Sequence, residues 1–482
     1  MGICLKKQAS SPIRTQQVRL SNENEPGAVN KIKVTDVYIL KKVLGQGAFG
    51  VVRRGARIDN PSIQVAIKTI TKAKLQNDLT QLKNEVDILA AIDHPNIVRL
   101  YDYFDEDYFF HIVTEFCSGG ELFETIVKNG RLTEHMVVRY MKKMLRAINH
   151  LHSRNICHRD LKPQNFLFES TAVDSELKLI DFGLAHRFSE DLHKTKMNME
   201  TFVGTPYFIA PEILTGKYDK KCDVWSLGII MCLMLTGIYP FTGSDNNEVY
   251  KSIVKHTLKF DSHEFKHISP LGVEFLKLLL QKNPALRPTC EEALSHPWIK
   301  LSKEEAADKN IFKKLSNFKP KNEMYRVTMG ILVKYMNAKE LKELTTAFNE
   351  IDTEGHGYLS IKDITVAIKK IGIVMPKKEI SEVFKKLDLA NNGIIHYSEF
   401  LAATVNARIN VDEQMKRTLF NFFDIDKSGD ITFENLKVVF KNMGLYYSDE
   451  KIMSIIKEVD LNGKGKINFE EFTNMLESNS LV

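Results

Sequence analysis

The stretch that organises this 482-residue chain is His158-Arg159-Asp160-Leu161-Lys162-Pro163-Gln164-Asn165. It places an acid, a basic side chain and an amide close together. An acid that accepts a hydroxyl proton, a cation that steadies a phosphate and an amide that binds Mg²⁺ suit phosphoryl transfer. Asp160, Lys162 and Asn165 are the candidates for these three tasks. The octet alone is only suggestive, so the interpretation depends on companions that follow in a fixed order on both sides.

The first companion is a glycine-rich run from Leu44 to Val52. Glycine lets backbone amides approach a phosphate because no Cβ stands in the way. The same spacing opens Rossmann folds, but there a helix follows, whereas here β-type residues lie on both sides. Lys68 ends the next apolar run. Such a lysine more often lies at the surface with its stem buried, but after this glycine loop a phosphate contact explains it better.

Two further motifs follow the octet, Asp181-Phe182-Gly183 and Ala210-Pro211-Glu212. In this order, the whole set resembles the motifs of eukaryotic protein kinases. The resemblance implies an α+β bilobal protein kinase domain over residues 38–299, with ATP and Mg²⁺ as cofactors. The Lys-Pro form of the octet is the Ser/Thr form, so the implied phosphate acceptors are protein serine and threonine.

The resemblance also implies roles for single residues. The residues implied to surround ATP are Leu44, Gly45, Gln46, Gly47, Ala48, Phe49, Gly50, Val52, Ala66, Lys68, Glu85, Thr114, Glu115 and Cys117. Asn165 and Asp181 would hold Mg²⁺. Glu85, on a helix predicted over 79–91, would pair with Lys68.

Other matched positions bear on specificity and regulation. Glu121 matches the acid that meets an arginine three residues before the phosphate acceptor, although a helix start also favours an acid. Gln164 stands where some relatives carry a second acid, so we expect one strong basic requirement in substrates. Thr201 matches a phosphorylated position whose phosphate would pair with Arg159. Thr205 matches the threonine that contacts the catalytic base. The positions matched to structural roles are Glu212, Asp223, Trp225, Gly228 and Arg287.

The C-terminal part repeats every 36 residues, with candidate loops that start at Asp352, Asp388, Asp424 and Asp460. Each loop has glycine at its sixth position and an apolar residue at its eighth. A period this regular predicts four helix–loop–helix units. The glycine supplies the sharp turn of an EF-hand, and the apolar residue pairs two loops within a lobe. Residues 341–482 are therefore predicted to form an all-α calmodulin-like domain of two EF-hand pairs. The loops are 352–363, 388–399, 424–435 and 460–471.

The ligand positions of these loops depart from the EF-hand pattern of oxygens at positions one, three, five and nine and glutamate at twelve. The candidate Ca²⁺ ligands are Asp352, Glu354, Ser360, Asp363, Asp388, Asn392, Glu399, Asp424, Asp426, Ser428, Asp430, Asp460, Asn462, Asn468 and Glu471. Each loop has a defect: His356 in the first, Ala390 in the second, Asn435 in the third and Lys464 in the fourth. The domain has 18 basic residues against 22 acidic ones, a small excess for four strong sites. We therefore expect weakened Ca²⁺ binding, and complete loss at all four loops is a live alternative.

The junction, residues 300–340, is basic and prone to form helix. Lys313-Lys314-Leu315-Ser316 places a lysine three residues before a serine, as in a basic substrate. Ser316 could occupy the site that Glu121 helps to define, and the junction would then be autoinhibitory. A plain basic linker helix explains the same charge equally well. The apolar residues of the junction also make it a candidate groove ligand for the EF-hand lobes.

The N-terminal tail, residues 1–37, is polar, with six basic and three acidic residues. A solvated, disordered tail explains this composition. The alternative is acylation, with myristate at Gly2 and palmitate at Cys4, which would attach the chain to a membrane surface. Lys6 weakens the myristoylation match because serine or threonine is preferred there.

Composition restricts the class of protein further. The net charge of +6 does not demand nucleic acid, and no nucleic-acid motif is present. Six scattered cysteines and no signal-peptide pattern predict a reduced, cytoplasmic protein that is membrane-associated if acylated. The apolar run Val224 to Phe241 is short and interrupted by polar residues, so a buried helix is predicted there.

Taken together, the order of tail, kinase, junction and EF-hands resembles the calcium-dependent protein kinases of plants and protists, from about Tyr38 to Leu476. The resemblance implies a monomer in which the junction blocks the kinase until Ca²⁺ rearranges the EF-hand lobes. One alternative is a calcium-insensitive kinase whose degenerate EF-hands form a docking scaffold. Another is a non-catalytic binding protein of kinase shape. That alternative is disfavoured because the catalytic set is complete: Lys68, Glu85, Asp160, Asn165 and Asp181.

Overall fold

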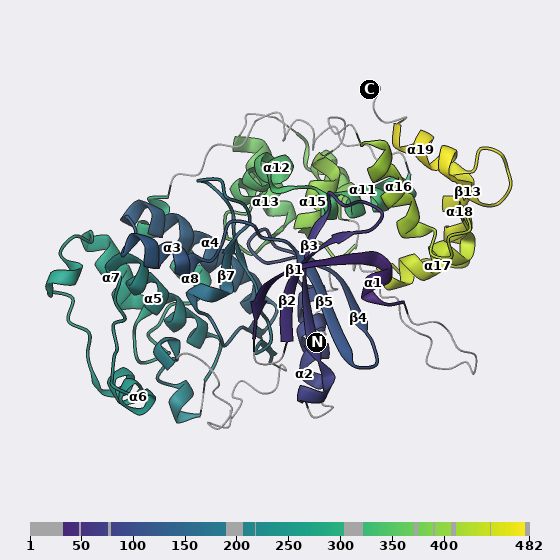
Figure 1. The fold of residues 1–482 in the computed structure, drawn as a ribbon. Helices are drawn as coiled ribbons and strands as arrows, with labels where there is room; N and C mark the ends of the chain where they lie inside the picture. Colours follow the sequence, from purple (N-terminus) through teal and green to yellow (C-terminus); the bar gives the residue numbers. More distant parts are fainter. Residues whose placement is uncertain are drawn as a thin grey trace, which may run out of the picture.

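The computed structural model describes residues 32–47, 50–75, 79–188, 206–216, 218–302, 322–370, 375–388, 391–405, 411–443 and 445–477. A β-sheet lobe and a helical lobe form the first part of the chain, and the C-terminal helices lie along both (Figure 1). This arrangement agrees with the predicted fold class of a bilobal α+β domain followed by an all-α module.

The β-sheet lobe is antiparallel, with strand order β1-β2-β3-β5-β4. Its elements are α1 (Val34–Val37), β1 (Tyr38–Gln46), β2 (Gly50–Arg57), β3 (Gln64–Thr71), α2 (Thr80–Ala91), β4 (Leu100–Asp105) and β5 (Phe109–Glu115). Side chains alternate between the two faces of a strand. In β3, Val65 and Ile67 are buried in a small outer core, so Lys68 projects from the other face.

The helical lobe is built around α5, whose side chains are almost all buried. Its elements are α3 (Leu122–Asn129), α4 (Glu134–Ser153), β6 (Ile156–Cys157), β7 (Phe166–Phe168), β8 (Leu177–Leu179), β9 (His186–Arg187), α5 (Lys221–Thr236), α6 (Asn246–Lys255), α7 (Pro270–Leu279), α8 (Cys290–Leu294) and α9 (Pro297–Lys300). Thr133 caps α4 through its hydroxyl, which accepts from the Met136 N–H. α5 confirms the buried helix predicted for the most apolar run. Within the described ranges, no helix combines the length and the hydropathy needed to cross a bilayer.

The C-terminal module consists of helices joined by four short loops. Its elements are α11 (Glu323–Tyr335), α12 (Ala338–Ile351), β10 (Tyr358–Leu359), α13 (Ile361–Lys370), α14 (Lys377–Leu387), β11 (Ile395–His396), α15 (Tyr397–Thr404), α16 (Glu413–Phe423), β12 (Asp430–Ile431), α17 (Phe433–Asn442), α18 (Asp449–Val459), β13 (Ile467–Asn468) and α19 (Phe469–Glu477). Leu359 pairs with Ile395, and Ile431 pairs with Ile467. These contacts confirm that the apolar eighth residues join the loops in two pairs.

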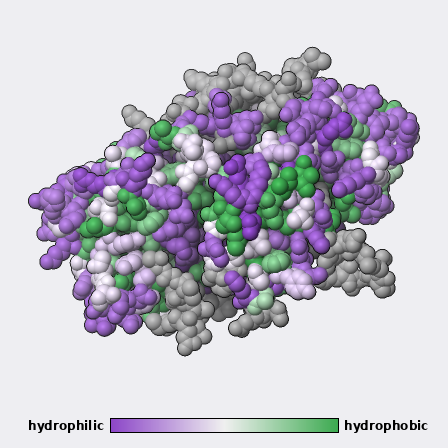
Figure 2. All heavy atoms as spheres, viewed as in Figure 1, coloured by the Kyte–Doolittle hydropathy of each residue, from purple (hydrophilic) through white to green (hydrophobic). Residues whose placement is uncertain are grey.

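The helix α11 connects the module to the β-sheet lobe. Its apolar side chains, such as Ile331 and Leu332, belong to the same core as the EF-hand helices. At its end, Tyr335 packs against the outer core of the sheet, as does Met415 of α16. On the outer surface drawn in Figure 2, hydrophobic residues gather near the middle of the molecule and hydrophilic residues cover both ends. The module is therefore seated on the sheet by apolar contact as well as by hydrogen bonds.

Candidate active site

The predicted phosphate contact Lys68 lies between two carboxylates. Its Nζ is 2.8 Å from Glu85 Oε1 on α2 and 3.1 Å from Asp181 Oδ1. Burial alone would lower the pKa of Lys68, but the two carboxylates raise it above its usual value. For Asp181, burial opposes ionisation and the Lys68 charge outweighs it, so the pKa is lowered. The site therefore holds a fixed ammonium group beside an ionised carboxylate, which suits a nucleotide phosphate with its metal ion.

The acid, cation and amide of the octet also converge. Asp160 Oδ2 accepts from Lys162 Nζ at 2.7 Å and from Asn165 Nδ2 at 3.1 Å. The same amide nitrogen donates to the Asp160 carbonyl at 2.7 Å, which fixes the turn between them. The Oδ1 atom of Asn165 is the atom that could bind a cation. Asn165 and Asp181 thus fit the divalent ion that the sequence predicts, because a carboxylate and an amide oxygen are hard ligands.

A buried carboxylate on α5 holds this loop in place. Asp223 accepts from the backbone N–H groups of His158 and Arg159, both at 2.9 Å, and from His152 Nε2 at 2.8 Å. Burial alone would raise the pKa of Asp223, but the hydrogen bond and charge of His152 and the backbone donors lower it. The catalytic loop is therefore anchored through its backbone to a fixed negative charge.

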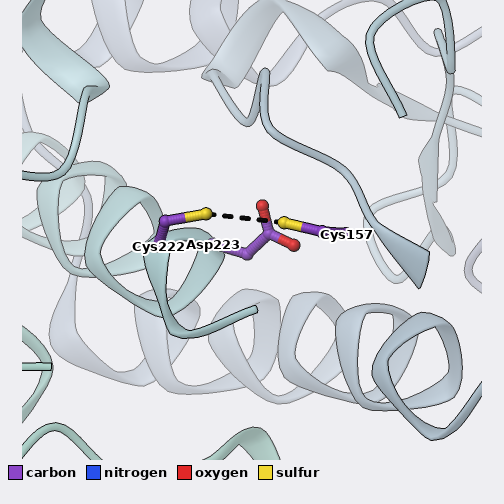
Figure 3. Close-up of side chains that lie close together, drawn as sticks. All are labelled: Cys157, Cys222 and Asp223. Carbon is purple, nitrogen blue, oxygen red and sulfur yellow. Dashed lines mark hydrogen bonds between the residues drawn. The ribbon is translucent and has the colours of Figure 1, made fainter. Parts of the chain in front are cut away.

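Two cysteines flank this anchor. In Figure 3 the sulfurs of Cys157 and Cys222 face one another at 3.4 Å beside the Asp223 carboxylate. These three groups could in principle surround a metal ion. However, Asp223 is already engaged with three donors, and burial raises the pKa of the Cys157 thiol well above its usual value. Protonated thiols are poor ligands, so the cluster is a packed part of the loop support.

Arg159 turns toward the segment that follows Asp181. Its Nε donates to the Leu184 carbonyl at 2.6 Å and its Nη1 to the Tyr218 hydroxyl at 3.1 Å. The predicted partner of Arg159, phosphorylated Thr201, lies outside the described residues. So do six other predicted residues, Gly2, Cys4, Ala48, Phe49, Thr205 and Ser316. Their roles stay predictions.

The glycine-rich run joins β1 to β2 as a hairpin, as predicted. Over the residues that the structure describes, no atom lies within 4 Å of a Cβ built at Gly45 or Gly47. Gly50 differs, because a Cβ there would overlap the Thr69 carbonyl of β3. Glycine at position 50 is thus explained by strand packing, and only the first two glycines are explained by room for a phosphate.

The end of β5 is called the hinge here because it leads from the β-sheet lobe to the helical lobe. It carries a network of ion-paired side chains that the sequence did not reveal. Glu115 Oε2 is 2.6 Å from Arg99 Nε, and Glu115 Oε1 is 2.9 Å from Lys178 Nζ. Burial would raise the pKa of Glu115, but Lys178 and Arg99 lower it. The Glu115 carboxylate is therefore committed to these ion pairs, and its backbone N–H donates to the Arg99 carbonyl at 3.0 Å. Cys117 and Thr114 lie half-buried beside it.

Glu121 stands at the start of α3, directly before the helix. It also forms an isolated β-bridge with Leu167, two residues after Asn165. Burial and the neighbouring Glu124 raise the pKa of Glu121. The residue thus serves as a helix-start acid, the alternative that the sequence left open, and at the same time lies next to the catalytic loop.

The fourth EF-hand loop retains the best geometry for a cation. Glu471 Oε1 accepts from Leu461 N at 2.9 Å and Asn462 N at 3.0 Å, so the closing glutamate folds back over the loop start. Asp460 accepts from the backbone N–H groups of Lys464 and Gly465, and the Lys464 residue is exposed. Side-chain oxygens at positions one, three, nine and twelve fit Ca²⁺, whereas Lys464 offers no side-chain oxygen at position five.

The second and third loops fit less well. In the third, Asn435 accepts from Thr432 N at 3.1 Å and caps a helix, and the Asp430 carboxylate pairs with Lys466 at 2.6 Å. Asp424 and Asp426 both accept from Ser428 N. In the second, Glu399 is buried and accepts from His396 N at 2.7 Å. Asp388 accepts from the N–H groups at Asn392 and Gly393.

Comparisons with known proteins agree with both halves of the chain. Residues 38–299 match the family model of the protein kinase domain, and residues 341–405 and 412–477 match the EF-hand domain pair. Calcium-dependent protein kinase 3 of Plasmodium berghei (strain Anka) is 34% identical over 348 residues, 71% of this chain and 62% of the relative. Calcium-dependent protein kinase 11 of Arabidopsis thaliana is 34% identical over 346 residues, 70% of this chain and 69% of the relative.

A further relative extends the match. Calcium-dependent protein kinase 4 of Plasmodium berghei (strain Anka) is 33% identical over 383 residues, 76% of this chain and 71% of the relative. The chain spans less than two thirds of the length of the first relatives it matches. The shared kinase domain, the shared EF-hand pairs and this coverage lead to one conclusion: the chain belongs to the calcium-dependent protein kinase family.

Proposed function

We propose that the chain is an ATP- and Mg²⁺-dependent protein serine/threonine kinase regulated by Ca²⁺ through its EF-hand module. One observation carries the proposal. The Lys68–Glu85–Asp181 cluster is assembled from distant parts of the sequence, and the Asp160–Lys162–Asn165 cluster is assembled within the octet.

The side chains divide the work of phosphoryl transfer. Asp160 orients the acceptor hydroxyl and takes its proton, and Lys162, held beside it, steadies the charge that develops on the phosphoryl group. Lys68 binds the nucleotide phosphates because Glu85 and Asp181 fix its position. Mg²⁺, when bound by Asn165 and Asp181, would neutralise phosphate charge.

Transfer of labelled phosphate from ATP to a serine peptide tests this proposal, with and without a Ca²⁺ chelator. Wild type is expected to transfer phosphate, and Asp160→Asn to lose transfer while still binding nucleotide. A chelator is expected to lower the rate. Transfer that survives Asp160→Asn would contradict the catalytic assignment. Transfer unchanged by chelator would favour the calcium-insensitive scaffold, a candidate supported by the ligand defects of the loops.

We also propose that substrates carry a basic residue before the acceptor and that Glu121 reads it. The support is its position beside the catalytic loop and its carboxylate. The test compares a peptide that has arginine at the third position before serine with its alanine counterpart. Glu121→Gln is expected to erase the preference, whereas Glu124→Gln, on the same helix, is expected to keep it. A preference that survives Glu121→Gln would refute the assignment.

Three further proposals rest on sequence alone. The junction is autoinhibitory and presents Ser316 to the site, and the chain acts as a monomer. The chain is cytoplasmic and reaches membranes when Gly2 and Cys4 are acylated. Membrane fractionation of Gly2→Ala and Cys4→Ser tests the last proposal, since both variants are expected to become fully soluble. An unchanged membrane fraction would refute it.

A further inference from the structure

The first EF-hand loop, 352–363, is pressed against the helical lobe of the kinase domain. Three side chains on two adjacent turns of α4 bind backbone carbonyls of this loop and of the helix α12 that leads into it. Arg146 Nη2 donates to Asn349 O at 3.0 Å and Asn149 Nδ2 to Gly355 O at 3.0 Å. His150 Nδ1 lies 2.8 Å from His356 O and donates to this carbonyl in the tautomer that carries its proton on Nδ1. These contacts depend on the positions of backbone carbonyls and not on the side chains of the loop.

The three α4 side chains are buried: Arg146 is 5% exposed, Asn149 6% and His150 0%. A buried polar group without a partner costs about 1–3 kcal/mol, so such groups need acceptors in the folded protein. Here the loop supplies the acceptors of Asn149 and His150, and the last turn of α12 supplies that of Arg146. The sequence gives no reason for an arginine, an asparagine and a histidine on the buried face of α4 until the loop is placed against them.

The glycines of the first loop separate it from the other three. Gly355 and Gly357 have φ values of +69° and +73°. A Cβ on Gly357 would fall inside contact distance of His150 and His94, and a Cβ on Gly355 would lie 2.7 Å from Leu294 Cδ1. Among the described residues, no atom lies within 4 Å of such a Cβ at the matching sixth-position glycines of the other loops, Gly393, Gly429 and Gly465. Within the part of the chain that the structure describes, only the first of the four loops has its sixth-position glycine pressed against a neighbour.

The side chains at the ligand positions of the first loop make other interactions. Glu354, at position three, pairs with Lys362 at 3.0 Å. His356, at position five, stacks on the Tyr358 ring with centroids 5.4 Å apart. Asp363, at position twelve, accepts from Ser360 N at 2.8 Å as a helix cap. Its side chain is one methylene shorter than the glutamate of a standard loop, and these residues do not fit Ca²⁺ well.

The turn of the first loop is closed by internal hydrogen bonds. Asp352 is 2% exposed, and its two oxygens accept from His356 N at 3.0 Å and Gly357 N at 2.7 Å. The loop therefore has a defined shape that is made by its own backbone. Beside it, Ser398 N of the second unit donates to Asp93 Oδ2 at 2.8 Å, which extends the same contact face.

We propose that the first EF-hand loop is a kinase-docking element that binds α4 in place of binding Ca²⁺. The module is then held on the helical lobe by the shape of this loop, and ion binding is left to loops such as the fourth. This inference is independent of the proposed phosphoryl transfer, because its tests measure contacts and ions rather than activity.

The ion half of the proposal is tested with Tb³⁺, a Ca²⁺ surrogate whose emission is excited through a tyrosine at very short range. Tyr358, at position seven, is the ideal sensitiser for an ion in the first loop, whereas the same position in the other loops is Ile394, Asp430 or Lys466. Full-length wild type and Tyr358→Phe are titrated with Tb³⁺ under tyrosine excitation. Equal emission from both, or none from either, is expected. Emission lost in Tyr358→Phe would overturn the proposal.

The docking half is tested by hydrogen exchange on the full-length chain. Gly357→Ala is expected to speed exchange about tenfold across the second half of α4, the effect of losing about 1.4 kcal/mol. The matched control Gly393→Ala, at the same loop position with open space, is expected to leave α4 unchanged. Chelator is expected to leave the protection of α4 in wild type intact. Protection of α4 that is equal in all variants, or that disappears with chelator, would overturn the proposal.

A variant on the kinase side covers the case in which Gly357→Ala unfolds the loop. Asn149→Ala leaves the loop sequence intact and removes one donor. It is expected to speed exchange in residues 349–359, whereas His135→Ala, at an exposed position on the first turn of α4, is expected to have no effect. Exchange in the loop that ignores Asn149→Ala would contradict docking through these carbonyls.

Discussion

The replacement of Asp223 by asparagine tests how the catalytic loop is held. One carboxylate oxygen accepts from His158 N and His152 Nε2, and the other accepts from Arg159 N. In asparagine one oxygen becomes an NH₂ group. Whichever way the amide is turned, that NH₂ group faces a backbone N–H of the loop, because each oxygen position serves one such donor.

The expected cost follows from these contacts. One buried donor left unpaired costs about 1–3 kcal/mol, and loss of charge from the remaining bonds adds about 1 kcal/mol. A total of about 2–4 kcal/mol, if it displaces the catalytic loop, lowers kcat/KM by roughly 30- to 700-fold. Nucleotide affinity is expected to stay close to wild type, because the Lys68–Glu85–Asp181 cluster does not contact Asp223.

The assay is steady-state peptide phosphorylation, with binding of a fluorescent ATP analogue and a melting curve for each variant. Asp219→Asn is the matched control, since Asp219 is exposed just before α5 and accepts from Lys221 N at 2.8 Å, which asparagine can also do. Activity of folded Asp223→Asn within threefold of Asp219→Asn would refute the claim that this carboxylate positions the loop.

Three other outcomes are expected. Glu85→Gln weakens the hold on Lys68 by about 1–3 kcal/mol, so kcat/KM for ATP falls roughly 5- to 150-fold, and an unchanged value in steady-state assays would count against the pair. Glu212→Gln leaves the fully buried Arg287 without its carboxylate, which destabilises the kinase domain by about 3–5 kcal/mol in denaturant unfolding; a loss below ~1 kcal/mol would contradict this. Burial lowers the pKa of Lys334 to about 8, so its folded form sheds a proton before its unfolded form. Stability therefore rises with pH from about 8 toward the ordinary lysine pKa, and Lys334→Met should lack that rise in melting curves.

The kinase half of the site was predictable because its motifs are local. Each motif, such as Asp181-Phe182-Gly183, is recognisable from its own residues. The order of the motifs implies that they converge in the folded protein. The Lys68–Glu85 pair expected from the resemblance is present at 2.8 Å. Composition or periodicity alone would not have placed Asp181 beside Lys68, since 113 positions separate them.

Residues whose role depends on a distant partner were missed. Arg99 and Lys178 follow no local pattern, and their significance appears only when β4, β5 and β8 place them around Glu115. His152, in the last turn of α4, supports the anchor of the catalytic loop through Asp223, 71 positions away. Asn149 is a similar case, because its acceptor lies 206 positions away and is a backbone carbonyl. A backbone acceptor leaves no mark in the sequence.

Arg99 shows how such a hidden partner joins the module to the nucleotide hinge. Its Nε binds the Glu115 carboxylate at 2.6 Å, and its Nη1 donates to Val333 O, near the end of α11, at 3.0 Å. If α11 moves away, this guanidinium loses an acceptor at a half-buried position, and the unpaired donor costs about 1–3 kcal/mol. Coupling free energies are reciprocal, so a nucleotide that favours the Arg99–Glu115 geometry also favours the seated α11 by the same amount. The Arg99 side chain therefore couples the position of the module to the electrostatics of the hinge, and this coupling does not pass through a calcium ligand.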